Sequence, residues 1–281
     1  MRVSVILATY NQPRWLEKSL WGFATQTYRD FDIMLADDGS GPETAAVVDR
    51  MRVETGLAIT HVWHEDRGFR KTEILNRAIL ATPSEYLIFS DGDCIPRDDF
   101  IAAHVRLSQP ERYLSGGYLK LPPETSEAIT PEDIRSGRFS DLDWLRAHGY
   151  KPGYRAIRLM RSPLLPGILD RATSRRSAWR GNNSSTWRAA IVEVNGFDND
   201  MAYGSEDRAL GERLMNAGVQ PIKIRHRAPT LHLDHGRPYQ DPAIGRRNYE
   251  RCVAIRKQGT VRAAFGLAEL PPAPTLPYNP G

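Results

Sequence analysis

The stretch YLIFSDGDCIPRDDF, residues 86–100, places two carboxylates at the end of an apolar run. Residues 86–89 are typical of a buried strand, and Asp91, Gly92 and Asp93 follow where that strand must end. Carboxylates separated by one glycine can turn toward a common point as the chain leaves the sheet, and the glycine allows a close approach. Such hard oxygen ligands suit Mg²⁺ or Mn²⁺ bridged to phosphate oxygens. Taken alone, two such aspartates more often belong to a solvated loop or a helix cap than to a metal site.

The residues around this stretch alternate between apolar, strand-like runs and helical patterns. This alternation, with strands apolar on both faces, predicts an α/β fold with a mostly parallel central sheet flanked by helices. In such sheets ligands bind beyond the carboxyl ends of the strands, which is where the two aspartates fall. The strands are expected over residues 3–9, 31–37, 57–64 and 86–91, and the helices over residues 13–26, 43–53, 71–81 and 98–107.

The rest of the chain is less regular but is interpreted as part of the same domain. A helix is expected from Ser205 to Ala217, with Ser205 as its cap, and a strand over residues 221–226. The last thirteen residues hold five prolines and predict an extended tail. The expected organisation is a nucleotide-sugar-binding half (1–108), an irregular acceptor-side insertion (109–180), a catalytic acceptor half (181–240), and a C-terminal helix with a Pro-rich tail (241–281).

The composition limits the class of protein. Of 281 residues 41% are apolar and 26% are charged, and no apolar run approaches the roughly 18 residues that cross a bilayer. Two cysteines form no disulfide framework, and the start of the chain lacks the pattern of a signal peptide, so we expect a cytoplasmic protein. Residues 151–180 carry eight Lys and Arg against Asp170 alone. This basic segment fits an anionic lipid, a diphosphate, an acidic glycan, nucleic acid, or simply a solvated face.

Two other strand ends carry groups that suit a nucleotide. Asp37 and Asp38 offer acceptors for a base N–H or for ribose hydroxyls, and Tyr10 could stack on a base, although each alone is an ordinary turn residue. The glycine-rich loops of dinucleotide enzymes and P-loop ATPases are absent from the sequence. The phosphates would then be neutralised by metal and by basic side chains, for which Arg70 and Lys71 are candidates.

At this point the sequence resembles a known family. VSVILATYNQPRWLEKSLWGFATQTYRDFDIMLADDGS, GFRKTEILNRAI and YLIFSDGDCIPRDDF are similar to the nucleotide-sugar half of inverting family two glycosyltransferases, which have the GT-A fold. GNNSSTWRAAIVEVNGFDNDMAYGSEDRALGERLMNAG resembles the acceptor half shared with β-1,4-galactosyltransferases and chondroitin-polymerase-type enzymes. The resemblance covers roughly residues 1–108 and 178–236.

The resemblance implies roles for individual residues. Asp207 matches the general base, and Glu206 matches the acid that contacts a sugar. A metal, Mn²⁺ or Mg²⁺, is implied at Asp93 and His232, with His235 as the second choice. The implied donor contacts are Ala8 (through its backbone), Tyr10, Asp38 and Asp91, and we add Asn182 and Asn183 as residues that line the sugar pocket.

The chemistry of the residues agrees with these roles. An inverting transfer needs one carboxylate to accept the proton of the acceptor hydroxyl and one cation to stabilise the departing diphosphate. At the start of a helix, Asp207 is expected to have a lowered pKa and to stay ionised, whereas both acids could instead merely complement the helix dipole. His232, between two leucines, could likewise be a core residue.

The sequence therefore predicts an inverting, metal-dependent glycosyltransferase that uses a UDP-sugar. The expected acceptor is a glycan or lipid-linked glycan of a bacterial surface polysaccharide or lipopolysaccharide, and the basic segment would allow peripheral contact with an anionic membrane at the inner face of the plasma membrane. No nucleic-acid partner is expected, because the segment carries no reading motif. Two alternatives stay open: a nucleotide-sugar or glycan binding module without turnover, and a nucleotidyltransferase.

Overall fold

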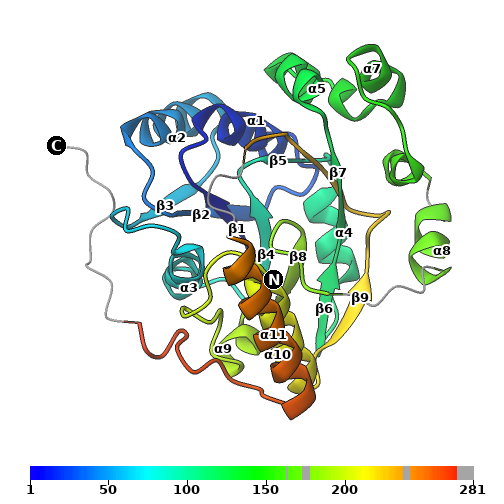
Figure 1. Cartoon of the computed structure of the whole chain (residues 1–281). Helices are drawn as coiled ribbons and strands as arrows, with labels where there is room; N and C mark the ends of the chain where they lie inside the picture. Colours follow the sequence, from blue (N-terminus) through cyan, green and yellow to red (C-terminus); the bar gives the residue numbers. More distant parts are fainter. Residues whose placement is uncertain (163, 173–177, 237–240, 271–281) are drawn as a thin grey trace.

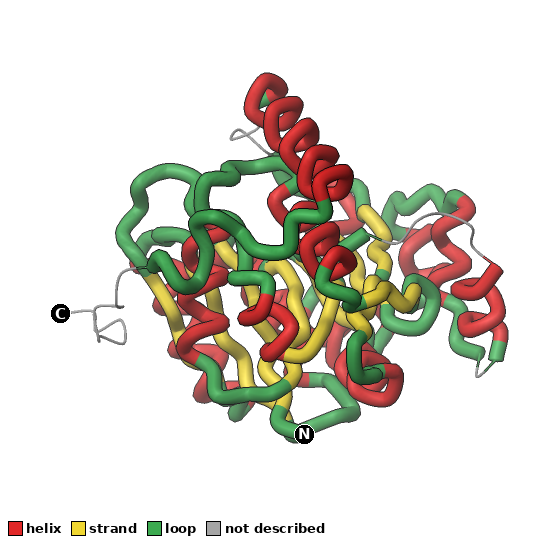
Figure 2. The backbone as a smooth tube through the Cα atoms, turned by 90° about the horizontal axis from the view of Figure 1, so that it is seen from below, coloured by secondary structure: helices red, strands yellow, loops and turns green. Residues whose placement is uncertain are grey.

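A twisted central sheet with helices on both faces forms the body of the molecule (Figures 1 and 2). The computed structural model describes residues 1–162, 164–172, 178–236 and 241–270. The sheet has seven strands in the order β3-β2-β1-β4-β8-β6-β9. They are β1 (Val3–Thr9), β2 (Phe31–Asp37), β3 (Ile59–Trp63), β4 (Tyr86–Asp91), β6 (Arg112–Ser115), β8 (Ser184–Trp187) and β9 (Gln220–Lys223).

The four strands predicted first run parallel to one another, and the later part of the sheet is mixed. β8 pairs antiparallel with both β4 and β6, while β9 is parallel to β6. The prediction of a mostly parallel sheet flanked by helices is confirmed. The helices of the body are α1 (Pro13–Ala24), α2 (Pro42–Thr55), α3 (Lys71–Ala81), α4 (Phe100–Leu107), α9 (Arg188–Glu193), α10 (Glu206–Asn216) and α11 (Pro242–Gln258).

Alternating side chains of the central strands build two separate cores. On β1, Val3, Val5 and Leu7 pack on one face with α1, α2 and α4, whereas Ile6 and Ala8 pack on the other face with α3, α9 and α10. The period of two along a strand requires this division. Both faces are apolar because helices cover both of them, as Figure 1 shows.

A second, three-stranded sheet lies beside the carboxyl end of β4. Its order is β5-β10-β7, formed by β5 (Cys94–Pro96), β10 (Pro229–His232) and β7 (Gly117–Lys120). It has its own apolar core, which includes Leu119, Leu231 and Phe139. The sequence analysis did not predict this sheet, and it joins the DGD segment to the region around His232.

The region predicted to be irregular, residues 109–180, carries short elements packed around this small sheet. They lie along the upper and right-hand edges of Figure 1 and are α5 (Pro123–Ala128), α6 (Pro131–Arg135), η1 (Arg138–Ser140), α7 (Leu142–Ala147), η2 (Tyr154–Leu159) and α8 (Leu165–Ala172). Among the described residues, no helix is long and apolar enough to cross a membrane. Most of the expected Pro-rich tail, from residue 271, lies outside the described residues.

Candidate active site

The carboxyl ends of β1, β2 and β4 meet at one edge of the large sheet and border a cavity of about 620 Å³. Register brings Ala8 opposite both Ala36 and Asp91, so residues distant in sequence become neighbours there. All but two of the thirteen predicted site residues line the cavity. These are Ala8, Tyr10, Asp38, Lys71, Asp91, Asp93, Asn182, Glu206, Asp207, His232 and His235.

The side of the cavity expected to hold the base of the nucleotide is built from β1 and the segment after β2. Oδ1 of Asp38 lies 2.8 Å from Nε2 of His64, and its Oδ2 accepts a hydrogen bond of 3.0 Å from the backbone N–H of Arg70. Tyr10 donates its hydroxyl to Asp66 over 2.8 Å. Asp38 is therefore held in one orientation, and Tyr10 is fixed at the rim. The carbonyl of Ala8 already accepts from the N–H of Gly92.

Arg70 and Lys71 separate at the start of α3. Lys71 points into the cavity, where its Nζ lies 2.7 Å from Oδ1 of Asp91. The guanidinium of Arg70 instead pairs with Glu73 over 3.3 Å, and Arg70 does not line the cavity. Successive residues of a helix point about 100° apart, so only one of the two can face the site. The prediction that the Arg70 side chain binds the donor is therefore wrong, and only its backbone N–H supports the site.

Lys71 is the central cation of this part of the cavity. Burial alone would lower the pKa of its ammonium, but the carboxylates of Asp91, Glu206 and Asp93 outweigh that effect and raise the pKa. The side chain is thus a fixed positive charge between the strand-end carboxylates and the first turn of α10.

Asn182 and Asn183 also diverge. Asn182 lines the cavity, with its amide nitrogen 3.8 Å from Sγ of Cys94. Asn183 is fully buried, and its amide donates to the carbonyls of Gly117 and Ala228 over 2.9 and 2.7 Å. Neighbouring side chains at the entry to a strand point to opposite sides, so Asn183 ties the start of β7 to the residue that precedes β10 rather than contacting a ligand. The assignment of Asn183 to the sugar pocket is wrong.

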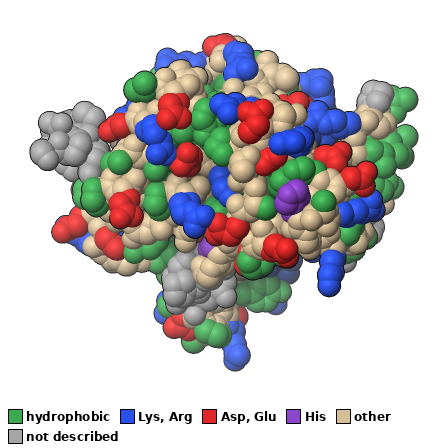
Figure 3. Space-filling model, turned by 90° about the horizontal axis from the view of Figure 1, so that it is seen from above, with side chains coloured by type: hydrophobic (Ala, Val, Ile, Leu, Met, Phe, Trp, Pro, Cys, Tyr) green, Lys and Arg blue, Asp and Glu red, His purple; other side chains and the backbone are tan. Residues whose placement is uncertain are grey.

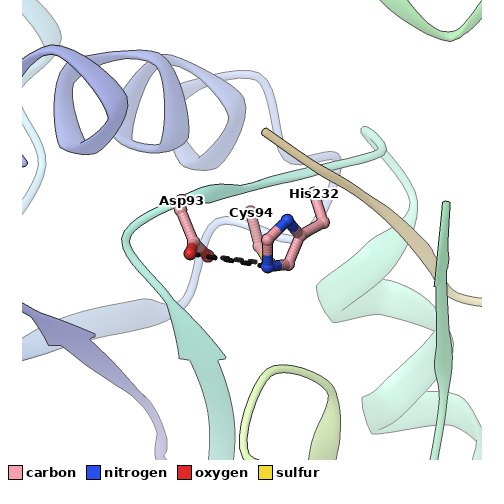
Figure 4. A group of neighbouring side chains, drawn as sticks. All are labelled: Asp93, Cys94 and His232. Atoms are coloured by element: carbon pink, nitrogen blue, oxygen red, sulfur yellow. Dashed lines mark hydrogen bonds and ion pairs between the residues drawn. The ribbon is translucent and has the colours of Figure 1, made fainter. Parts of the chain in front are cut away.

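The candidate metal centre forms where β10 pairs with β5. Register places His232 opposite Cys94, and its Nε2 lies 3.5 Å from Oδ2 of Asp93 (Figure 4). Nε2 of His235 lies 2.6 Å from the same oxygen. Burial would raise the pKa of Asp93, but the hydrogen bond from His235 and the charges of both imidazoles lower it to about 2. Both histidines therefore face the carboxylate.

The donor set of this centre fits a divalent ion. One ligand atom each from Asp93, Cys94 and His232 lies within 4.8 Å of the other two. A carboxylate with imidazole nitrogen suits Mn²⁺ better than Mg²⁺, which prefers oxygen ligands. The sequence analysis assigned no role to Cys94. Burial raises the pKa of its thiol, and its Sγ lies 3.3 Å from Oδ1 of Asp93. The position of Cys94, directly after the DGD motif, is the signal that the sequence analysis passed over.

The first turn of α10 presents both predicted catalytic acids to the cavity. Oδ2 of Asp207 accepts from the backbone N–H of Gly181 over 3.2 Å, and Glu206 accepts from Gly204 over 2.8 Å. Ser205 stands at the cap position as predicted, but its side chain makes no capping hydrogen bond and its φ is +66°. This left-handed turn sets the direction in which the two acids leave the helix.

The protonation of these acids differs from the sequence expectation. Burial and the neighbouring charge of Asp207 raise the pKa of Glu206 to about 7, although Lys71 opposes this. Burial also raises the pKa of Asp207, against the backbone hydrogen bonds from Gly181 and Arg208. The expectation of a lowered pKa at the helix N-terminus is wrong, because desolvation outweighs the helix dipole here. A raised pKa suits a group that must accept a proton near neutral pH.

Several cavity residues were not foreseen from the sequence. Tyr118, from β7, has its ring 5.6 Å from the ring of His232, and Arg180 lies beside it. Phe69 and Tyr203 form an edge-to-face pair at 5.7 Å on the opposite wall. Tyr203, three residues before Glu206 in MAYGSEDR, was within reach of sequence reasoning, whereas Tyr118 enters only through long-range strand pairing.

Comparison with known proteins identifies the family. The model of "Glycosyl transferase family 2" matches residues 4–158, more than half of the chain. The chain belongs to glycosyl transferase family 2. A Bacillus subtilis relative, the uncharacterised glycosyltransferase YfnE, is 26% identical over 84% of this chain and 65% of its own length. The validoxylamine A glucosyltransferase of Streptomyces hygroscopicus subsp. jinggangensis is 27% identical over 85% of this chain and 57% of its own. The chain thus spans less than two thirds of either relative.

Solved structures of other proteins that resemble this chain support the GT-A fold. A mannosyltransferase from Pyrobaculum calidifontis, in complex with GDP-Man and Mn²⁺, has a TM-score of 0.57 at 22% identity and covers 85% of this chain and 58% of its own. GalNAc-T7 with UDP, GalNAc and Mn²⁺ has a TM-score of 0.62 at 16% identity, covering 91% and 48%. At these identities the likeness concerns the fold alone.

Proposed function

We propose that this family 2 chain is an inverting, divalent-metal-dependent glycosyltransferase that moves a sugar from a UDP-sugar to a glycan hydroxyl. The observation that carries the proposal is that one cavity brings together Asp207, a carboxylate with a raised pKa, and Asp93 with its two histidines. A base and a cation site that share a cavity meet the two needs of such a transfer. Synthesis of a bacterial surface polysaccharide or lipopolysaccharide is the setting that we propose.

In the proposed reaction the acceptor oxygen forms a bond to the anomeric carbon while the bond from that carbon to the diphosphate breaks. Asp207 takes the proton of the acceptor hydroxyl, and Lys71 supplies positive charge between Asp91 and Glu206. Asp93, His232 and His235 would hold Mn²⁺ or Mg²⁺, which stabilises the departing diphosphate. Attack from the face opposite the leaving group gives inversion. The Asp38 and Tyr10 side would hold the nucleotide.

The choice of donor draws support from the neighbours' ligands. GalNAc-T7 was solved with UDP and Mn²⁺, and Staphylococcus aureus TarS with UDP-GlcNAc, whereas the Pyrobaculum enzyme holds GDP-Man. A panel of UDP-sugars together with GDP-mannose therefore tests the proposal fairly. Release of nucleotide with Mn²⁺ present is measured for each donor, and donor affinity is measured by calorimetry.

Two variants separate the roles of metal site and base. Asp93→Ala should lose metal-dependent donor binding, whereas Asp207→Asn should bind donor normally and lose roughly 10²- to 10⁴-fold in turnover, the usual contribution of a general base. Asp143→Asn, which changes an exposed aspartate on α7, is the control and should behave as wild type. Donor binding without any turnover in the wild type would favour the binding-module alternative. Binding of no donor at all would refute the proposal.

A further inference from the structure

Four arginines gather next to the active-site cavity around β7. We call Arg155, Arg158, Arg180 and Arg225 the arginine cluster. Nη1 of Arg158 donates to the carbonyl of Tyr118 over 2.5 Å, and the guanidinium carbon of Arg180 lies 6.0 Å from the centre of the Tyr118 ring. Arg155 and Arg158 lie on η2 (Tyr154–Leu159), whereas Arg180 and Arg225 come from two other segments, and the charges of the other three act on Arg158.

Gly117 explains how two of these side chains fit. A β-carbon at Gly117 would lie 3.2 Å from the guanidinium carbon of Arg158 and 3.2 Å from Cβ of Arg225. The guanidinium of Arg158 and the Cβ of Arg225 therefore lie directly against the backbone of β7. Any larger residue at Gly117 would force them to move.

Three members of the arginine cluster, Arg155, Arg158 and Arg180, lack the carboxylates that normally accompany such a group in the described part of the chain. Within the described residues, Arg155, Arg158 and Arg180 form no ion pair. Burial, followed by the positive charges of Arg155, Arg180 and Arg225, lowers the pKa of Arg158 to about 10. Arginines that repel one another in this way are a ready site for an oxyanion, which the planar guanidinium binds with two hydrogen bonds.

The nearby acids are already occupied. Asp170, the one acid of residues 151–172, is buried and lies 2.9 Å from Nε of Arg227 and 2.8 Å from Nδ1 of His226. Asp98 pairs with Arg161 over 2.9 Å. Neither acid is therefore available to pair with Arg155, Arg158 or Arg180.

The arginine cluster reaches the acceptor side of the reaction centre. Arg180 lines the cavity and directly precedes Gly181, whose N–H holds the carboxylate of Asp207. Arg155, by contrast, is exposed on η2. An anion held between Arg180 and Arg155 would sit beside the segment that holds the proposed base and extend toward the surface.

Apolar side chains stand exposed beside the cluster on the same segment. Tyr154, Ile157, Leu164, Leu165 and Ile168 have 73, 39, 74, 37 and 58% of their surface exposed, and we call them the apolar ridge. Hydrophobic side chains gather in Figure 3 at the right-hand edge, the side on which α8 lies in Figure 1. Single exposed apolar residues are ordinary, but five within fifteen residues, interleaved with arginines, indicate a surface that an apolar partner covers.

We propose that the arginine cluster binds a phosphate or diphosphate group carried by a lipid-linked acceptor, and that the apolar ridge covers the start of its hydrocarbon chain. The inference rests on the proposed function, and it specifies the acceptor class. It favours a lipid phosphate over an acidic glycan because charge and apolar surface occur together on η2 and the segment that follows.

Binding of three probes tests the inference. Protein saturated with UDP and Mg²⁺ is titrated in a calorimeter with farnesyl phosphate, inorganic phosphate and glucuronate. We expect farnesyl phosphate to bind about 10-fold or more tightly than inorganic phosphate, because burial of apolar surface adds to the ionic contact. Glucuronate should bind more weakly than either. Glucuronate binding as tight as farnesyl phosphate would overturn the inference in favour of an acidic glycan.

Variants assign the binding to the arginine cluster and the apolar ridge. Arg180→Gln and Arg155→Gln should each weaken both phosphate probes about 10-fold. Arg161→Gln removes the same charge from the same segment, but its guanidinium already pairs with Asp98, so its effect should stay below about 2-fold. Ile168→Ser should remove only the advantage of the farnesyl chain. Unchanged phosphate affinity in both cluster variants would refute the inference.

Two further measurements distinguish failure of this inference from failure of the proposed function. UDP affinity is measured for every variant, and an Arg180→Gln protein that loses UDP but keeps the phosphate probes would place Arg180 with the donor and overturn the inference. The titrations are repeated without UDP, so a protein that fails to bind UDP refutes the proposed function alone. Arg155 is exposed, so its variant tests the cluster without risk to the fold.

Discussion

Asp207 and Glu206 are adjacent carboxyl groups in one partly enclosed site, and each disfavours ionisation of the other. Burial raises the pKa of both, and the charge of Asp207 helps to raise the pKa of Glu206 to about 7. Proton loss from such a pair occurs in two steps that belong to the pair as a whole. Between the two steps the remaining proton is shared by the two carboxyl groups, so Asp207 is fully ionised, and fully able to act as the proposed base, only above the second step.

The pH dependence of the reaction should follow this pair of acids. The wild-type rate of UDP release should rise with pH and approach its plateau above about pH 7, where the pair loses its second proton. In Glu206→Gln the neighbouring charge is gone, so the pKa of Asp207 should fall and the rising limb should move to lower pH. The measurement is kcat/KM as a function of pH with one donor. The quantity compared between proteins is the pH at which kcat/KM reaches half of its maximum.

Glu43→Gln is the matched control for the pH profile, because Glu43 is an exposed acid in the first turn of α2. Its profile should coincide with that of the wild type. If the rising limb of the Glu206→Gln profile stayed in place or moved to higher pH, the pair of Glu206 and Asp207 would not control the rate.

Single residues also show where sequence reasoning reaches its limit. Asp93, Asp207 and Lys71 could be predicted, because a strand end or a helix start fixes the direction of their side chains. Arg70 and Asn183 could not be told from their neighbours, since one position along a helix or strand turns a side chain away from the cavity. Desolvation of Asp207 likewise depends on tertiary packing that no local pattern records.

At the scale of elements, α10 matters because it carries both acids. A β-carbon at Gly211, in the middle of this helix, would lie 2.7 Å from Cβ of Trp179 and 3.0 Å from its backbone nitrogen. Trp179 is fully buried in the core on the face of the large sheet that α3, α9 and α10 cover, so its side chain cannot move aside. Because Gly211 has no side chain, α10 can lie close to the segment that contains Arg180 and Gly181.

Gly211→Ala should consequently destabilise the protein, despite the better helix propensity of alanine. Overpacking of this kind costs about 1–3 kcal/mol, and a displaced α10 should also reduce kcat because Asp207 moves with it. Gly245→Ala in α11, where a β-carbon meets nothing within 4 Å, should instead stabilise by about 0.5–1 kcal/mol. Denaturant unfolding and turnover are measured for both variants. Equal stability of the two would show that the close approach at Trp179 is relieved without cost.

The elements themselves were unequally predictable. α3 begins and ends at the predicted residues, and β1, β2 and β4 match their apolar runs, because long periodic segments carry their own signal. The small sheet of β5, β10 and β7 was missed, since strands of three or four residues are too short to show a period. Yet this sheet brings His232 to Asp93, so the assignment of His232 as a metal ligand rested on family resemblance, whereas the carboxylates came from the local pattern.

At the scale of the whole molecule, the candidate metal centre joins the two sheets. Asp93 follows the end of β4 in the large sheet, and His232 ends β10 in the small one. The N–H of Leu233 also donates to the carbonyl of Asp93 over 2.8 Å. An ion held by both residues would link the donor half of the chain to the elements around β7. Binding of the ion should therefore increase the stability of the whole protein toward unfolding.

Thermal unfolding with and without Mn²⁺ and UDP tests this link. A ligand at 100 times its dissociation constant stabilises the folded state by about 2.7 kcal/mol, which corresponds to an increase in Tm of about 5 °C or more for a chain of this size. We expect such an increase for the wild type with UDP and Mn²⁺ together, a much smaller one for Asp93→Ala, and an intermediate one for His235→Ala. Asp143→Asn on α7 should respond as the wild type does, because its side chain is exposed on a helix outside the cavity. If Asp93→Ala gained as much in Tm as the wild type, the ion would have to bind elsewhere and would not link the two sheets.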